Sequence, residues 1–130
     1  MKIQTINTIE LTNDCNLRCK YCIQPLLDEG GRKREIMSDE VFYKSLELLK
    51  VLCDRGTQRE VNLNGNGEST LDPDLPERIR ATKDVVGDRF VRMCTNGVNM
   101  TYSLAHILKY LRLILLIDRH TISCLLSLTS

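Results

Sequence analysis

The sequence lacks an excess of charge of either sign. Its 18 Lys and Arg residues stand against 17 Asp and Glu residues, which leaves a formal net charge of +1 over 130 residues. A chain this close to neutral produces no bulk electrostatic field that would favour nucleic acid or an acidic membrane surface. Any partner must therefore be inferred from individual sites.

Long hydrophobic runs are also missing. The longest apolar stretch, Leu113 to Ile117, falls far short of the roughly 20 residues that cross a bilayer as a helix. Residues 1–10 carry polar side chains throughout and lack the continuous apolar segment of a secretory signal. We therefore expect a cytoplasmic protein without membrane contact. In that reducing compartment, the six cysteines are better suited to metal or redox work than to disulfides.

Predicted strands and helices alternate along the chain. Isoleucines at positions 3, 6 and 9, together with Leu11, predict a first strand. Three further apolar segments predict strands at residues 61–63, 90–94 and 113–117. A Gly-rich and charged stretch separates the first strand from the first helix, and each later pair of strands is separated by one predicted helix.

The helices are predicted from capping residues and from apolar residues at helical spacing. Ser38 can cap a helix that ends near Gly56 and has one apolar face, formed by Phe42, Leu46, Leu49 and Cys53. Asp74 and Glu77 have the spacing of a capping box, and Gly87 is expected to end that second helix. Thr101 is expected to cap a third helix, with apolar residues at Leu104, Ile107, Leu108 and Leu111.

Strands that alternate with helices across short loops are typical of parallel α/β folds, either open sheets or βα barrels. A complete eight-unit barrel takes about 250 residues, so this chain has room for about four units and cannot close a barrel by itself. We therefore expect residues 1–130 to form one α/β domain, a truncated, partial (β/α) TIM-like barrel whose second half is absent. The open barrel edge is a candidate contact for an oligomer.

Three cysteines, Cys15, Cys19 and Cys22, lie close together on the loop after the first predicted strand. Structural zinc is almost always held by four ligands, and no fourth Cys or His is close in the sequence. Thiolates are the usual ligands of iron–sulfur clusters. The count of three favours a cluster in which one iron has no protein ligand, and the alternatives are a zinc site or buried thiols.

This segment resembles the radical S-adenosylmethionine (radical SAM) family, in the N-terminal part of its core domain. In that family three cysteines are separated by three and by two residues, with an aromatic residue before the third, and Tyr21 has this position here. The resemblance covers about residues 3–118. It implies that the three cysteines bind a 4Fe-4S cluster, that the remaining iron binds the amino and carboxylate groups of S-adenosylmethionine, and that Tyr21 lies at the cofactor.

The resemblance also implies an activity. A radical SAM enzyme cleaves S-adenosylmethionine reductively to methionine and a 5′-deoxyadenosyl radical, which abstracts a hydrogen atom from a substrate. The electron would come from a donor such as a flavodoxin or a ferredoxin. No segment defines a substrate pocket, so a small molecule, a peptide or a nucleoside are all compatible substrates. The alternative functions are a truncated, catalytically inactive iron–sulfur-binding fragment and a zinc-binding interaction module.

A glycine-containing loop at residues 65–69 follows the second predicted strand, at the end where barrel enzymes build their sites. It resembles the family's Gly-Gly-Glu motif, which implies that Gly67 and Glu68 contact the amino group of S-adenosylmethionine. Asn66 replaces the first glycine of that motif, and Ser69 replaces a common proline. An ordinary turn is the alternative, because Asn and Gly dominate turns.

A second loop, residues 95–97, follows the third predicted strand. It resembles a Thr-Asn-Gly segment of the family that lies near the cofactor, which implies a cofactor-binding role for Thr95 and Asn96. Here too, Asn-Gly also fits a simple turn.

The remaining cysteines, histidines and basic residues have simpler interpretations. Cys53, Cys94 and Cys124 are expected to pack as small hydrophobic side chains. The two histidines, His106 and His120, lack metal-ligand spacing and are expected to be structural or solvated. The basic run at residues 32–34 is balanced by nearby acidic residues, which favours a solvated loop over a phosphate contact.

Overall fold

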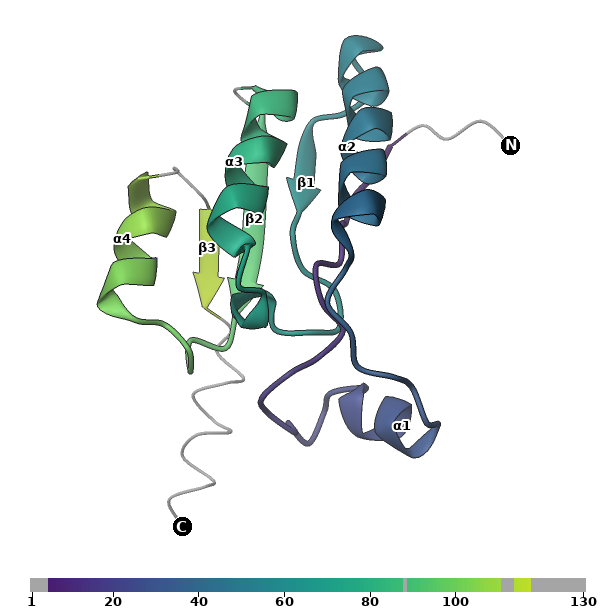
Figure 1. The fold of residues 1–130 in the computed structure, drawn as a ribbon, viewed down its shortest axis with the longest axis vertical. Coiled ribbons are helices and arrows are strands. Elements are labelled where there is room, and N and C mark those ends of the chain that lie inside the picture. Colours follow the sequence, from purple (N-terminus) through teal and green to yellow (C-terminus); the bar gives the residue numbers. More distant parts are fainter. Residues whose placement is uncertain (1–4, 88, 111–113, 118–130) are drawn as a thin grey trace.

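A computed structural model of the protein describes residues 5–87, 89–110 and 114–117. Its centre is a sheet of three parallel strands in the order β1 (Glu60–Asn62), β2 (Phe90–Thr95) and β3 (Ile114–Ile117). The helices are α1 (Gln24–Glu29), α2 (Asp39–Asp54), α3 (Leu75–Val86) and α4 (Tyr102–Tyr110), and a single 3-10 turn, η1, spans Ser69–Leu71. The predicted alternation of parallel strands and helices is confirmed (Figure 1).

The described strands form an open sheet. Val61 of β1 is paired with Val91 of β2, and Met93 of β2 is paired with Leu115 of β3. All three arrowheads point toward the part of the molecule that contains α1 (Figure 1). The carboxyl ends of the strands therefore meet at one edge, which is where ligands bind in parallel α/β sheets.

The predicted first strand is much shorter than expected. It is reduced to a parallel bridge between Thr8 and Asn62, in which the Ile9 N–H donates to the Asn62 carbonyl and the Asn62 N–H to the Asn7 carbonyl, both at 2.9 Å. Isoleucines spaced three apart do not match the two-residue period of a strand. The Ile6 N–H accordingly donates to the Gln58 side chain at 2.9 Å. The segment still runs parallel to β1 at the sheet edge.

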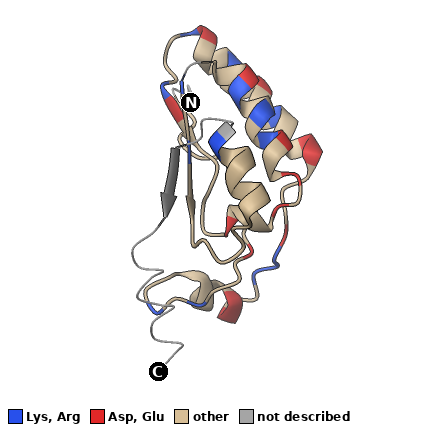
Figure 2. Cartoon of the chain, turned by 90° about the vertical axis from the view of Figure 1, so that its left-hand side faces the viewer, with Lys and Arg blue, Asp and Glu red and all other residues tan. Residues whose placement is uncertain are grey.

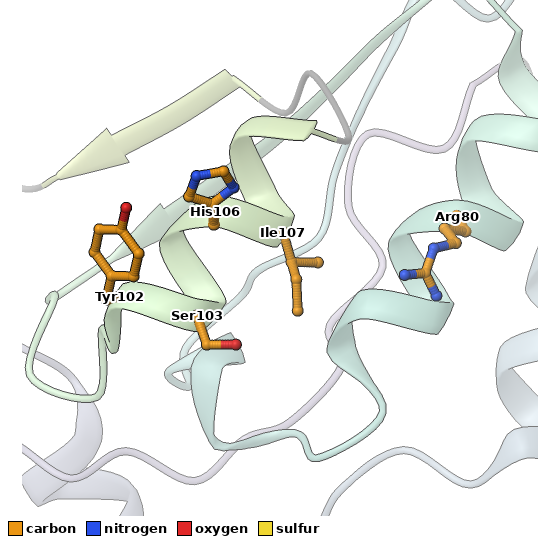
Figure 3. Close-up of a pocket in the computed structure, with 5 residues that line it drawn as sticks. All are labelled: Arg80, Tyr102, Ser103, His106 and Ile107. Carbon is orange, nitrogen blue, oxygen red and sulfur yellow. The ribbon is translucent and has the colours of Figure 1, made fainter.

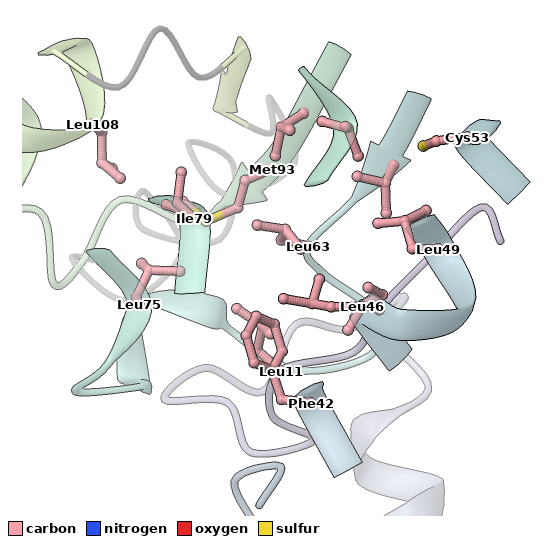
Figure 4. Close-up of a cluster of buried hydrophobic side chains, with 14 residues drawn as sticks. Leu11, Phe42, Leu46, Leu49, Cys53, Leu63, Leu75, Ile79, Met93 and Leu108 are labelled. Carbon is pink, nitrogen blue, oxygen red and sulfur yellow. The ribbon is translucent and has the colours of Figure 1, made fainter. Parts of the chain in front are cut away.

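One face of the sheet and the inner faces of the helices form the hydrophobic core. From α2 it receives Phe42, Leu46, Leu49 and Cys53, as the helical spacing predicted, and from the strands Val61, Val91 and Met93 (Figure 4). Cys53 is 6% exposed, which confirms its packing role. Acidic and basic residues both occur along α2, the longest helix (Figure 2).

The other face of the sheet is open within the described residues. Along β2 the buried side chains Val91, Met93 and Thr95 alternate with Phe90, Arg92 and Cys94, which are exposed or half-buried. Cys94 therefore lies at the surface, which contradicts its predicted burial, because it has the outward parity of its strand.

None of the described helices has the length and apolar character of a membrane-spanning segment.

Most predicted helix ends are confirmed. The Ser38 hydroxyl accepts from the Val41 N–H at 3.4 Å, the Thr101 hydroxyl accepts from the Leu104 N–H at 3.1 Å, and Gly87 ends α3 with a φ of 63°. The predicted capping box is wrong, because the Asp74 side chain makes no capping hydrogen bond. Pro76, in the first turn of α3, has no N–H to offer a cap. The Asp72 carboxylate instead accepts from the Asp74 N–H at 3.0 Å.

Candidate functional site

Three loops meet beyond the carboxyl ends of the strands. The first is residues 12–24, which contain the cysteines and end on the first residue of α1. The second is residues 64–70, which follow β1 and include the start of η1. The third is residues 95–99, which begin with the last residue of β2. The parallel register brings the second and third loops side by side, and the first joins them because the N-terminal segment runs along β1. Most of the predicted site residues lie in these loops.

The cysteine loop is compact. Cys15, Cys19 and Cys22 are each half-buried, and none forms a disulfide. A turn brings the last two together, since the Cys22 N–H donates to the Cys19 carbonyl at 3.0 Å. Within the part of the chain that the structure describes, no three His, Cys, Asp or Glu side chains converge closely enough to hold a single metal ion.

Burial raises the pKa of the Cys15 thiol above its ordinary value. A hydrogen bond from the Leu17 N–H opposes this effect, while the nearby charges of Glu68 and Cys22 strengthen it. The two cysteines at the ends of the loop therefore interact with each other. A thiol that is protonated in this way must release its proton before it can bind a metal.

Ion pairs close the loop on its outer side. Asp28 of α1 pairs with Arg18 at 2.9 Å and with Arg34 at 2.7 Å, and Arg34 also reaches Asp14 at 3.2 Å. Arg32 pairs with Glu10 at 3.3 Å. The basic run at residues 32–34 is thus engaged by acidic side chains of its own chain, as the balance of charges in this stretch predicted.

Gln24 is a site residue that the sequence analysis did not identify. This residue begins α1, two positions after the third cysteine, and is 2% exposed. Its side-chain amide donates to the Asn13 carbonyl at 2.8 Å and to the Asn66 carbonyl at 2.6 Å. Gln24 therefore ties the cysteine loop to the loop after β1. The available signal was a glutamine two residues after the third cysteine, but the burial of that glutamine is not readable from one sequence.

Gly67 lies against the backbone of the cysteine loop. A Cβ atom at this position would overlap the carbonyl oxygens of Thr12 and Asp14. The neighbouring Glu68 N–H donates to the Asp14 carbonyl at 2.7 Å. The glycine is therefore needed for the close approach of two backbones, whatever ligand the site takes.

The Glu68 carboxylate is buried and connects the second and third loops. The residue is 4% exposed. Its Oε1 accepts from the Thr70 N–H at 3.1 Å and from the hydroxyls of Thr70 and Thr95, both at 2.7 Å. Its Oε2 accepts from the Asn96 N–H at 2.7 Å. Three of these hydrogen bonds are at Oε1 and one is at Oε2, so of the two oxygens Oε2 is the one that can accept a further donor.

The loop after β2 in turn contacts the cysteine loop. The Asn96 side-chain amide donates to the Asn16 side chain at 2.7 Å and lies 3.8 Å from the Cys15 sulfur, within hydrogen-bonding range for sulfur. The Asn16 amide donates to Asn99 at 3.3 Å. Gly97 has a φ of 75°, which permits the tight turn that follows. Asn96 thus approaches Cys15, and the cofactor-binding role of Thr95 and Asn96 stays a prediction.

The family model for the Radical SAM superfamily matches residues 9–123 of this chain. The chain belongs to the Radical SAM superfamily. The matched region contains all three loops of the site. The resemblance inferred from the cysteine motif is therefore confirmed at the level of the family.

Similar proteins place this radical SAM chain beside longer members. GTP 3′,8-cyclase of Aquifex aeolicus (strain VF5) is 35% identical over 91 residues, which are 69% of this chain and 27% of the cyclase. Molybdenum cofactor biosynthesis protein 1 of Bos taurus is 30% identical over 104 residues, 78% of this chain and 15% of that protein. The chain thus spans about a quarter or less of the length of these relatives.

A solved structure matches the fold. The crystal structure of BtrN in complex with AdoMet and 2-DOIA superposes with a TM-score of 0.73 and 19% sequence identity, over 92% of this chain and 47% of BtrN. The open parallel sheet of this radical SAM chain is therefore an arrangement found in a larger protein.

Tyr21 lies on the cysteine loop of this radical SAM chain with its side chain in solvent. The side chain is 86% exposed, and the Lys20 ammonium lies 5.7 Å from its ring centre.

A groove of about 460 Å³ runs between α3 and α4 and is lined by Arg80, Tyr102, Ser103, His106 and Ile107 (Figure 3). His106 is exposed there, in agreement with the expected solvated role. The predictions for Cys124 and His120 lie outside the described residues.

Proposed function

We propose that this chain is the N-terminal part of a radical SAM enzyme, in which Cys15, Cys19 and Cys22 hold a 4Fe-4S cluster. A bound cluster, reduced by an electron donor such as a flavodoxin or a ferredoxin, would supply the electron that cleaves S-adenosylmethionine to methionine and a 5′-deoxyadenosyl radical, and this radical would abstract a hydrogen atom from a substrate. The observation that carries the proposal is a loop of three cysteines, none of them in a disulfide, beside the loops that follow β1 and β2, in a chain whose family model covers residues 9–123.

The donor set fits a cluster better than zinc. Structural zinc draws its ligands to a single point, with Zn–S distances of about 2.3 Å. The described residues contain no group of three such side chains that converges on one ion. In a cluster each thiolate binds its own iron, so the three cysteines need not converge on one point. Three cysteines on one loop are therefore compatible with the cluster.

The residues around the thiols have distinct tasks in this proposal. Glu68 fixes the loop after β2 by accepting from Thr95 and Asn96, and its Oε2 retains capacity for an ammonium donor such as the amino group of S-adenosylmethionine. Gly67 lets the backbone before Glu68 approach the backbone of the cysteine loop. Tyr21, on the exposed side of the loop, is available to a ligand that arrives from solvent.

The proposal stops at the class of reaction. The cyclase has GTP in its name, and the crystal structure of BtrN contains AdoMet and 2-DOIA. These molecules differ, so the comparisons do not single out a substrate for this chain. The substrate of this chain is left as an unspecified hydrogen donor.

A second candidate is a chain that binds the cluster but does not cleave S-adenosylmethionine. It is favoured by the sheet, which has three strands among the described residues and an open face. BtrN, which binds AdoMet in its crystal structure, is about twice as long as the matched region.

Anaerobic reconstitution with iron and sulfide, followed by electron paramagnetic resonance, tests both candidates. A reduced cluster whose spectrum changes on addition of S-adenosylmethionine supports an open iron site, and formation of 5′-deoxyadenosine under dithionite supports cleavage. A cluster without 5′-deoxyadenosine would favour the second candidate. Zinc without iron in anaerobically purified protein would overturn both.

Paired cysteine variants identify the ligands. Cys19→Ala should abolish the brown absorption of the cluster, because it removes one of three thiolates. Cys94→Ala is the matched control, since Cys94 is exposed on β2 and outside the cysteine loop. Equal cluster content in both variants would contradict the proposed ligand set.

A further inference from the structure

Asn96 offers a side-chain hydrogen-bond donor to a proposed cluster ligand. Three N–H groups approach the sulfurs of Cys15 and Cys22, namely Leu17 N, Gln24 N and Asn96 Nδ2. The first two belong to the backbone two residues after each cysteine, so the local turn provides them whatever the side chain. Only the third comes from a side chain, 81 residues away in sequence.

The orientation of the Asn96 amide is fixed by its other contacts. Its Oδ1 accepts from the Val98 N–H at 3.0 Å, and a backbone N–H can only donate. The Nδ2 group must therefore face the opposite way, where one N–H meets Asn16 Oδ1 at 2.7 Å and the other points to the Cys15 sulfur at 3.8 Å. An Asn96 turned the other way would lose its acceptor and place an oxygen against the sulfur.

The backbone of Asn96 is held as firmly as its side chain. Its N–H donates to Glu68 Oε2 at 2.7 Å, and the preceding Thr95 hydroxyl donates to Glu68 Oε1 at 2.7 Å. Glu68 and Thr95 are both buried, at 4% and 2% exposed. The backbone of the donor residue is thus held by a buried carboxylate.

A donor aimed at a ligand sulfur changes the energy of the cluster. Reduction adds negative charge to the cluster and its thiolates, and the partial positive charge of an N–H stabilises the reduced form more than the oxidised form. Hydrogen bonds to the sulfurs are one of the quantities that set the reduction potential of an iron–sulfur centre. Asn96 therefore has the chemistry and the geometry to raise this potential.

We propose that Asn96 is a positioning residue that sets the reduction potential of the cluster through its hydrogen bond to Cys15. The inference rests on the proposed function, because it needs a cluster bound to Cys15. It gives Asn96 a hydrogen bond to Cys15, a proposed cluster ligand, in addition to any contact with S-adenosylmethionine.

The test is a redox titration of the reconstituted chain without S-adenosylmethionine, monitored by electron paramagnetic resonance. Asn96→Ala removes the donor. Asn96→Asp also removes it but keeps an oxygen for the Val98 N–H, so the turn is preserved. Asn99→Ala is the matched control, because Asn99 lies on the same loop and contacts Asn16 without approaching the sulfur.

Both Asn96 variants are expected to lower the ratio of reduced to oxidised cluster at a fixed potential by about threefold to tenfold, which is a shift of about 30 to 60 mV for a one-electron couple. Asn99→Ala should titrate like the wild type. An unchanged potential in Asn96→Ala, or an equal shift in Asn99→Ala, overturns the inference while leaving the proposed function intact.

Two further outcomes are decided by cluster content. If both Asn96 variants fail to load iron while Asn99→Ala loads normally, Asn96 maintains the loop and does not tune the cluster, and the inference fails. If the wild-type chain itself takes up no cluster, the proposed function fails first and the inference with it. Iron and sulfide analysis of each protein distinguishes these cases from a true shift in potential.

Discussion

Replacing Glu68 with Ala would test whether one buried carboxylate joins the loops of the site. The change leaves four donors without their acceptor, two from Thr70 and one each from Thr95 and Asn96. Thr95 is 2% exposed, so its unpaired hydroxyl should cost about 2 kcal/mol. The other three donors are half-buried, and water can replace the carboxylate at a cost of about 0.5 to 1 kcal/mol each.

We therefore expect Glu68→Ala to lower the free energy of unfolding by about 4 kcal/mol. Glu68→Gln should cost less, about 1 to 2 kcal/mol, because its carbonyl oxygen can still accept from the threonines while its amide group opposes the Asn96 N–H. Urea unfolding of the iron-free chain, followed by circular dichroism, measures both values.

Glu47→Ala is the control, since Glu47 is an exposed carboxylate on α2 and its loss should change stability by less than about 0.5 kcal/mol. The amide resonance of Asn96 provides a local measurement, and it should move upfield in Glu68→Ala as its hydrogen bond is lost. A loss of stability below about 1 kcal/mol in Glu68→Ala, or an unmoved Asn96 resonance, would refute the idea that this carboxylate holds the loops together.

Two other predictions concern the frame of the site. The Asp72 side chain is fully buried beside Arg78, and burial raises the pKa of its carboxyl group. The protonated form therefore contributes stability that is present below the unfolded pKa of about 3.8. This stability is lost as pH rises through the higher folded pKa. Asp72→Asn should flatten this part of the curve of unfolding free energy against pH, and an unaltered slope would contradict the assignment. Gly67→Ala should destabilise the chain by about 2 to 3 kcal/mol, because its Cβ meets the Thr12 carbonyl, whereas Gly30→Ala has room and should cost little. Urea midpoints that are equal for the two glycine variants would argue against a required close approach at Gly67.

Local patterns in the sequence predicted the elements that depend on local interactions. The apolar spacing of Phe42, Leu46 and Leu49 predicted α2, because one side of a helix must be buried wherever the helix lies. Ser38 and Gly87 marked helix ends for equally local reasons, a side-chain acceptor and a positive φ. The three cysteines identified the family because their spacing is contained in one short loop.

Other features depended on partners far away in the sequence. The N-terminal strand was reduced to a bridge, because its extent depends on hydrogen bonds to β1 and on competition from Gln58. The sequence similarly could not indicate that Gln24 is buried between two loops.

By itself, the sequence determined a parallel α/β chain of the Radical SAM superfamily with three cysteines on its first loop. Only the tertiary structure decided how the motifs relate to one another. It turned Glu68 toward Thr95 and Asn96, and it brought the Asn96 amide to the Cys15 sulfur. The physical reason is that periodicity and spacing act within a few residues, whereas contacts between loops are set by the order and direction of the strands that carry them.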